Sequence, residues 1–144
     1  MDHKAPEPVG LYEPWTAAGP LVAISAISSA ADGELMTGAV GRDIDLATAQ
    51  EAARRAARNL LAVLRDAVAG DLARVERVLS MRGHVNAASD FALVHQVIDA
   101  ASDLIIAELG DRGRHARTAI GCVTLPNGNA VTLEALVIVR EHVK

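Results

Sequence analysis

Short apolar runs near the N-terminus predict a β-hairpin. Residues 21–27 (LVAISAI) and 34–40 (ELMTGAV) are rich in strand-forming side chains. Asp32-Gly33 lies between them and is typical of a tight turn between antiparallel strands. Residues 1–10 carry two prolines and a glycine, so we expect a flexible arm there, followed by a single domain over residues 11–144.

Two later segments have the period of helices. Between Asp45 and Gly70 the apolar positions repeat every three to four residues, on a face rich in alanine. Asp45 can cap the N-terminus of this helix, and Gly70 suits the left-handed residue that follows a helix. A second helix is expected over residues 91–109, with Ser89 or Asp90 as its N-cap. The alanine-rich face favours close packing of the first helix on a sheet.

The remaining apolar segments predict three more strands. In residues 74–86, alternation places Leu79 and Met81 on the same side of a strand. Residues 114–125 and 130–139 are also strand-like, and the Pro-Asn-Gly-Asn turn between them is typical of a hairpin. The expected order of elements is therefore ββαβαββ.

Two helices and one sheet predict a two-layer α+β fold with both helices on the same face of the sheet. The other face needs a covering, because many strand positions are apolar on both sides. Examples are Ile120, Cys122 and Leu133. A monomer would expose a larger apolar patch than water usually tolerates, so the pattern favours self-association of the chain.

Composition and charge narrow the classes of function. The chain of 144 residues is 51% apolar, which is enough for one domain with a sizeable core. Its formal net charge of -4 offers no broad cationic surface for nucleic acid. The single cysteine, Cys122, forms no internal disulfide and no zinc-binding cluster, and no apolar run is long enough to span a membrane. Residues 1–10 lack the basic and apolar parts of a signal peptide, so we expect a cytoplasmic protein.

A more specific signal lies in residues 115–139, HARTAIGCVTLPNGNAVTLEALVIV. An arginine opens a strand, a Leu-Pro turn follows, and the next strand carries an acidic residue. This segment resembles the C-terminal signature of the reactive-intermediate deaminase (Rid/YjgF) family. The segment GHVNAASDF resembles the strand-to-helix junction of the same family, and the expected order of elements is also the same. The resemblance covers residues 11–139.

The resemblance implies a fold, an assembly and an activity. It implies a chorismate-mutase-like fold assembled as a homotrimer, with the helices outside, the sheets forming an inner β-barrel, and clefts between subunits. Active members of the family hydrolyse imines or enamines, such as 2-aminoacrylate, to the 2-oxo acid and ammonia. They need no metal and no bound cofactor. The implied ligand is a small carboxylate-bearing metabolite.

Three residues match the family's ligand site. The signature arginine falls on Arg117, the tyrosine near the N-terminus on Tyr12, and the serine at the end of the first strand on Ser25. Arginine suits a carboxylate anchor because its planar guanidinium makes two parallel hydrogen bonds to a carboxylate and stays charged. Tyr12 could instead clamp the N-terminal arm onto the sheet, and Ser25 could bond to the backbone.

Five positions depart from the family, two of them Ala26 and Ile27, which replace a glycine and a glutamine after the serine. His95 replaces an asparagine of the second helix and is either an acid or base near neutral pH or a helix histidine without function. Ala119 replaces a cysteine and leaves space beside the signature arginine. Thr132 replaces the first glutamate of a Glu-x-Glu pair that positions water, so only Glu134 remains on that face of the strand. Glu134 either approaches such a water or pairs with a surface charge such as Arg140.

Two functions therefore fit the sequence. In the first, the chain hydrolyses a reactive imine or enamine, with the carboxylate held by Arg117 and water positioned by Glu134, Thr132 or main-chain groups. In the second, it binds a small metabolite such as a 2-oxo acid between subunits without catalysis. The loss of one glutamate favours the second function, and the arginine fits both. An RNA-cleaving activity, also attributed to the family, would need a basic stacking surface that this sequence lacks.

Overall fold

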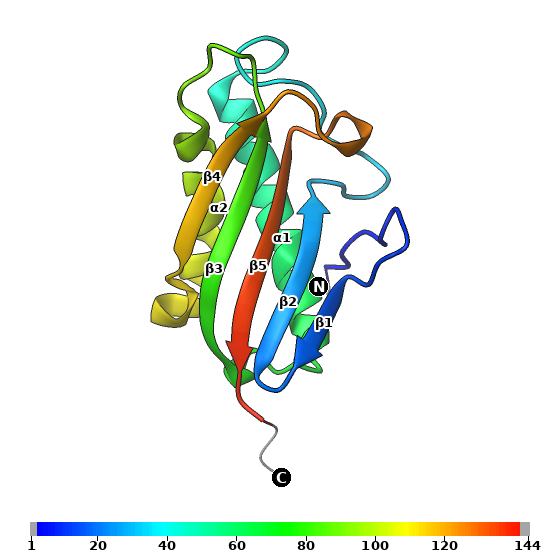
Figure 1. The fold of residues 1–144 in the computed structure, drawn as a ribbon, viewed down its shortest axis with the longest axis vertical. Coiled ribbons are helices and arrows are strands. Elements are labelled where there is room, and N and C mark those ends of the chain that lie inside the picture. The colour runs from blue at the N-terminus through cyan, green and yellow to red at the C-terminus, as the bar shows by residue number, and fades with distance from the viewer. Residues whose placement is uncertain (1–2, 142–144) are drawn as a thin grey trace.

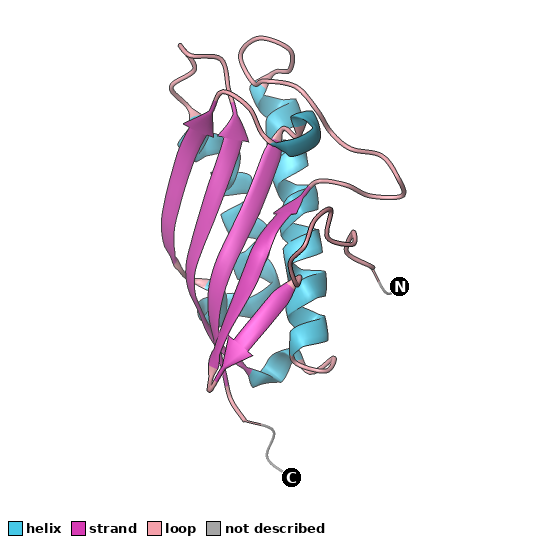
Figure 2. Ribbon diagram, turned by 45° about the vertical axis from the view of Figure 1, so that its right-hand side comes forward, coloured by secondary structure: helices cyan, strands magenta, loops and turns pink. Residues whose placement is uncertain are grey.

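The computed structural model describes residues 3–141 as one five-stranded sheet covered on one face by two helices (Figures 1 and 2). The strands are β1 (Trp15–Ala18), β2 (Leu21–Ser28), β3 (Val75–Asn86), β4 (Ala116–Cys122) and β5 (Val131–Val139). Their order in the sheet is β1-β2-β5-β3-β4, and only β3 and β4 are parallel neighbours. The helices are α1 (Leu46–Ala67) and α2 (Val94–Leu109). The expected ββαβαββ order and two-layer α+β fold are confirmed.

The N-terminal hairpin consists of β1 and β2, so the predicted pairing of residues 21–27 with residues 34–40 is wrong. Ala18 pairs with Leu21 across the turn. Residues 34–40 make only isolated bridges, although Val40 is completely buried. Their apolar side chains fill the core from a loop, and a short apolar run alone does not distinguish such a loop from a strand.

The predicted hairpin of the last two strands is also wrong. β4 pairs only with β3, and β5 lies between β2 and β3 (Figure 1). The segment β3-α2-β4 is a crossover unit, in which a helix returns the chain so that two strands run parallel. The Pro-Asn-Gly-Asn turn forms a short 3-10 helix, η3 (Pro126–Gly128), that carries the chain over the sheet to β5.

The boundaries of α1 follow the expected capping chemistry closely. The Asp45 side chain accepts a hydrogen bond from the Thr48 backbone nitrogen at 2.8 Å, which confirms the predicted N-cap. The C-cap residue is Val68, and the next two residues, Ala69 and Gly70, both have positive φ, at 54° and 86°. Gly70 therefore lies one residue beyond the position predicted for it.

The start of α2 differs from the prediction. The helix begins at Val94 rather than at residue 91, and its N-cap residue, Leu93, makes no side-chain capping bond. The predicted caps Ser89 and Asp90 are wrong because the chain makes a separate turn there, closed by the bond from the Phe91 nitrogen to the Ala88 carbonyl. A capping residue in the sequence marks a possible helix start, and the following backbone decides whether it is used.

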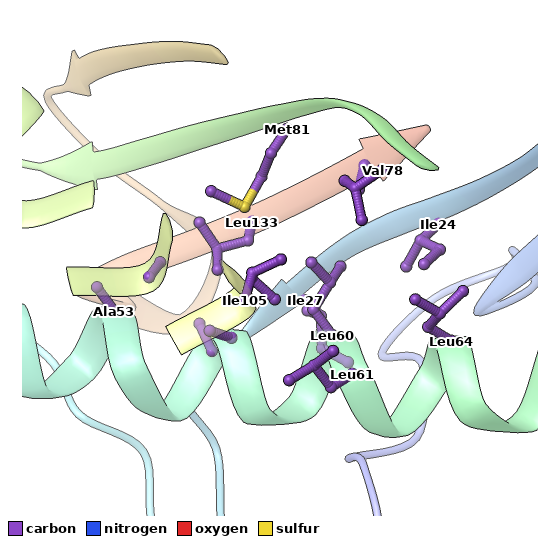
Figure 3. Close-up of a cluster of buried hydrophobic side chains, with 14 of the residues drawn as sticks. Ile24, Ile27, Ala53, Leu60, Leu61, Leu64, Val78, Met81, Ile105 and Leu133 are labelled. Carbon is purple, nitrogen blue, oxygen red and sulfur yellow. The ribbon is translucent and has the colours of Figure 1, made fainter. Parts of the chain in front are cut away.

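The core lies between α1 and the sheet. The alanine face of α1 is completely buried, and the leucines of its second half pack toward β2, as Figure 3 shows for Leu60 and Leu64 near Ile24 and Ile27. On the other side, α2 approaches β3 so closely that a Cβ on Gly83 would lie 2.5 Å from an atom of Ile98. Small residues at these contacts allow both helices to lie flat on one sheet.

A bulge in β3 changes which side chains point inward. The pairing of β3 with β5 shifts register between Val78 and Ser80. As a result Val78 is buried with 2% exposure and Leu79 is 48% exposed, so the predicted placement of Leu79 beside Met81 is wrong. Strict alternation cannot anticipate a bulge, because the extra residue reverses the faces on one side of it.

The N-terminal arm contacts α1. The His3 Nε2 and Asn59 Oδ1 atoms are within hydrogen-bond distance, and Ala5 packs against the core. Asn59 is completely buried, and its amide nitrogen donates to the carbonyls of Ser28 at 2.7 Å and Ala30 at 2.9 Å. One buried side chain therefore joins the arm, α1 and the loop after β2.

Candidate functional site

A cavity of about 590 Å³ opens between the N-terminal arm, the end of β2, η3 and the start of β5. Four of the predicted site residues line it: Tyr12, Ser25, Thr132 and Glu134. Its other walls are mostly apolar, with prolines from the arm and from η3. The structure thus brings together residues that are more than 100 positions apart in the sequence.

Alternation along β5 explains which of its residues reach the cavity. Leu133 is completely buried toward the helices, so its neighbours Thr132 and Glu134 lie on the opposite face of the sheet. The Glu134 carboxylate contacts two side chains of β3, with its Oε1 atom 3.8 Å from His84 Nε2 and 4.0 Å from Arg82 Nη1. The Glu134 carboxylate is therefore held between a neighbouring strand and the cavity.

Tyr12 bonds to the arm, and Ser25 bonds to the backbone just after it. The Tyr12 hydroxyl accepts a hydrogen bond from the Val9 nitrogen at 3.3 Å, and the Ser25 hydroxyl donates to the Glu13 carbonyl at 2.6 Å. These bonds match the alternatives in which Tyr12 clamps the N-terminal arm and Ser25 bonds to the backbone. The tyrosine uses only an oxygen lone pair in its bond, so its hydrogen can be donated to a ligand.

The charged side chains that line the cavity are all acidic. Two carboxylates, those of Glu7 and Glu134, line it, and among the described lining residues there is no lysine, arginine or histidine. Hydroxyl and amide groups of Thr132 and Asn129 add further polar atoms. Such a lining suits a ligand's nitrogen or water far better than its carboxylate.

Arg117 lies elsewhere. It is on the edge strand β4 and points to the helix side, where Nη1 donates to Asp99 Oδ1 at 2.8 Å and to Ser102 Oγ at 3.1 Å, and Nη2 donates to the His95 carbonyl at 3.3 Å. Its side chain is 23% exposed. Ala119 shares this face of β4 and packs against the core. His95 contributes its carbonyl to this contact, while the residue as a whole is exposed.

Within one chain, Arg117 and Glu134 therefore face opposite sides of the sheet. The predicted residues form two groups, one at the cavity and one at the edge formed by α2 and β4. A single ligand can touch both groups only if they come from different copies of the chain.

His115 extends the arginine group. Its Nδ1 atom lies 2.6 Å from the Gly113 carbonyl and its Nε2 atom 3.0 Å from Ser102 Oγ. Burial lowers the pKa of His115 below its ordinary value, and the charge of Arg117 acts in the same direction, while the bond to Gly113 opposes them. Reasoning from the sequence missed the roles of Asp99 and Ser102. The available signal was their spacing of four and seven residues after His95, which places all three on one helix face.

The lowered pKa of His115 predicts a pH dependence of stability. The unfolded chain binds the proton more readily, so the free energy of unfolding should decrease as the pH falls from about 6.5 toward the folded-state pKa. It should not decrease above pH 7 for this reason. His115→Gln should remove this contribution, measured as urea midpoints between pH 5 and 8. His95→Gln, at an exposed residue, is the control, and equal pH profiles for H115Q and wild type would contradict the prediction.

Two general properties bear on the class of protein. Within residues 3–141, no three His, Cys, Asp or Glu side chains are grouped so that they could hold a metal ion. The described helices include none that is long and apolar enough to cross a membrane. The fold and the cavity define a two-layer α+β protein with a small-molecule-sized pocket on its open sheet face.

Residues 4–139 match the family described as "YjgF/chorismate_mutase-like, putative endoribonuclease". The chain belongs to this family, which confirms the resemblance to Rid/YjgF proteins and the chorismate-mutase-like fold. Protein TCP17 of Trypanosoma cruzi is 41% identical over 106 residues, which are 73% of this chain and 66% of that protein. The chain thus covers slightly less than two thirds of this relative.

Solved structures share the fold. The protein Atu1372 of Agrobacterium tumefaciens, whose function is unknown, is 40% identical with a TM-score of 0.89, over 94% of this chain and 87% of that one. A "putative endoribonuclease" of Shewanella oneidensis is 24% identical with a TM-score of 0.91, over 96% and 92%. E. coli TdcF with bound serine is 18% identical with a TM-score of 0.68, over 93% and 92%. The identities of 18–40% are consistent with a divergent member.

Proposed function

We propose that this chain hydrolyses a reactive imine or enamine that carries a carboxylate, releasing ammonia and a 2-oxo acid. The site is a cleft between two copies of the chain, in which one copy supplies the cavity with Glu134 and the other supplies Arg117. The observation that carries the proposal is the separation of these two groups on opposite faces of one sheet. The cavity can bind the nitrogen of such a substrate and a water molecule, and Arg117 can bind its carboxylate.

In this proposal the cavity binds the nitrogen of the substrate and the attacking water. Its carboxylates and hydroxyls can accept hydrogen bonds, and in the proposed reaction Glu134, which lines the cavity, takes a proton from the attacking water. An enamine first moves its N–H proton to carbon and becomes the imine. Water then adds to the C=N carbon, while Glu134 takes one proton from the water and passes it to the nitrogen, which gives the carbinolamine. The carbinolamine hydroxyl gives its proton to the same nitrogen as the C–N bond breaks, so the products are the 2-oxo acid and ammonia and no proton is gained or lost overall.

In this proposal Arg117 binds the carboxylate of the substrate. A carboxylate entering the acidic cavity alone would meet like charge from Glu7 and Glu134, which costs free energy. A guanidinium from the neighbouring copy compensates this charge and fixes the substrate in one orientation. Serine, the ligand named for the related TdcF structure, also carries a carboxylate and a nitrogen.

Apolar residues on the uncovered side favour the assembly. Ile120, Leu136 and Leu79 are large hydrophobic side chains with 38–48% exposure, and β4 is an unpaired sheet edge. Isolated exposed apolar residues are ordinary, but a group of them on a sheet favours association. We propose a homotrimer with the sheets forming an inner barrel, in which residues 11–144 are the domain and residues 1–10 are an arm at the cleft. The single cysteine fits a cytoplasmic location.

The family description also names an endoribonuclease. The carboxylates in the cavity would repel an RNA backbone, and the net charge of -4 adds no attraction, so these observations favour a small metabolite over RNA.

A coupled assay tests the proposal. A pyridoxal-phosphate serine dehydratase generates 2-aminoacrylate, and ammonia and pyruvate release is followed with and without this chain, using the heat-denatured chain as control. We expect faster release with the native chain, and a trimer mass in solution. Binding of pyruvate without any acceleration for the imines tested would replace hydrolysis by the second function, metabolite binding, which Thr132 in place of a glutamate favours.

A further inference from the structure

Arg117 is the first member of a chain of hydrogen bonds that ends inside the protein. Its Nη1 atom donates to Ser102 Oγ at 3.1 Å, Ser102 Oγ lies 3.0 Å from His115 Nε2, and His115 Nδ1 lies 2.6 Å from the Gly113 carbonyl. This series of hydrogen bonds links β4, α2 and the turn η2 (Gly110–Gly113). Neither the cavity nor the proposed proton transfer involves Ser102 or His115.

The direction of each bond follows from the chemistry of its partners. The Gly113 carbonyl only accepts, so His115 Nδ1 carries a hydrogen and donates it. A neutral imidazole has only that one N–H, which leaves Nε2 as an acceptor for the Ser102 hydroxyl. The Ser102 oxygen then accepts from Arg117. Each donor in this series of hydrogen bonds has one acceptor, and this arrangement requires the neutral imidazole.

The same contacts leave part of the guanidinium for a ligand. Nη1 donates to Asp99 and Ser102, and Nη2 donates to the His95 carbonyl. Nε donates to no described residue, and Nη2 has a second hydrogen. Nε and Nη2 are therefore the nitrogens that remain to donate to a carboxylate.

Protonation of His115 would change these bonds. Nε2 would become a donor facing the Ser102 oxygen, and the serine hydrogen would have to turn away from it. The second lone pair of the Ser102 oxygen would still accept from Arg117. Burial and the positive charge of Arg117 both disfavour the imidazolium, so the neutral form is the one that fits these contacts.

We propose that Ser102 is a positioning residue for Arg117, and that the neutral imidazole of His115 fixes the Ser102 hydroxyl in this role. The inference rests on the proposed role of Arg117 as carboxylate anchor. Ser102 does not touch the ligand. It holds Nη1 in place, so that the Nε and Nη2 edge keeps one orientation toward the cleft.

Pyruvate binding by the full chain, measured by calorimetry at pH 8, tests the proposal. Ser102→Ala should bind about tenfold more weakly than wild type. Ser102→Thr keeps the hydroxyl and should restore the wild-type affinity. Ser89→Ala, in the loop before α2, is the control and should behave as wild type.

A second measurement separates this inference from the proposed function. Guanidinium NMR of the free protein reports the mobility of Arg117 without any ligand. A rigid Arg117 side chain in wild type that becomes mobile in S102A, in a protein that binds no carboxylate, would support positioning and refute the anchor role. Equal pyruvate affinity and equal Arg117 mobility in S102A and wild type would overturn the role of Ser102 alone.

Discussion

Arg117→Gln should weaken pyruvate binding by about 100-fold or more, since it removes two charge-assisted hydrogen bonds to the carboxylate and the only cation assigned to it. Glutamine is two bonds shorter than arginine and does not replace the bond to Asp99. The Asp99 side chain is 60% exposed and can bond to water instead, so the fold at α2 should survive. Arg117→Lys keeps the charge but loses the planar pair of donors, and we expect an intermediate affinity. The measurement is calorimetric titration with pyruvate at pH 8.

The neighbouring Arg114 provides a matched control for the loss of one positive charge. It pairs with Asp111 at 3.1 Å, and its side chain is 64% exposed. Arg114→Gln should change the affinity little, because an exposed charge acts weakly through water. Equal losses in both variants would mean that general charge, rather than a contact of Arg117, attracts the ligand. Unchanged binding in R117Q would refute the anchor.

Glu134→Gln should lower kcat for imine hydrolysis by about 100-fold to 1000-fold, as expected when a general base is removed. The amide keeps the shape of the side chain and can still contact His84, so KM should change far less than kcat. The assay is ammonia release coupled to a serine dehydratase, corrected for spontaneous hydrolysis. Pyruvate affinity should stay near the wild-type value, because the carboxylate is held by the other copy of the chain.

Glu76 on β3 is the control for the loss of a carboxylate. It is exposed and does not line the cavity, so Glu76→Gln should keep wild-type kcat. A Glu134→Gln variant with full kcat would remove this residue from the mechanism. Water would then have to be positioned by Thr132 or by main-chain groups of the cavity, and the search for the base would move to Glu7.

The sequence predicted the elements of the fold better than their pairing. The helix after Asp45 was recognised because its period and its cap are local properties. The hairpins were misplaced because strand pairing is a long-range property, so β5 pairs with β2 and β3 although its nearest neighbour along the chain is β4. The burial of Leu79 was predicted wrongly because one bulge in β3 reverses the alternation.

The sequence predicted only those site residues that belong to a recognisable motif. The signature of residues 115–139 singled out Arg117 and Glu134, but not that they face opposite sides of the sheet, since this depends on the pairing of β4 and β5 with β3. Ser102 belongs to no motif, and His115 opens the signature segment without a role assigned to it. They were found through their contacts with Arg117, because α2 packs across β4 and brings residues 15 and 13 positions apart within hydrogen-bond distance.

The anchoring of the arm by Asn59 has a practical consequence for protein production. Residues 6–9 form one wall of the cavity, and His3 is bonded to the buried amide of Asn59. An affinity tag fused ahead of the arm would place foreign residues next to the cleft and could loosen that wall. The end of β5 lies at the other end of the sheet from η3 (Figure 1), so a tag joined after it keeps clear of the cavity. Binding and kinetic measurements are therefore best made with a C-terminal, cleavable tag.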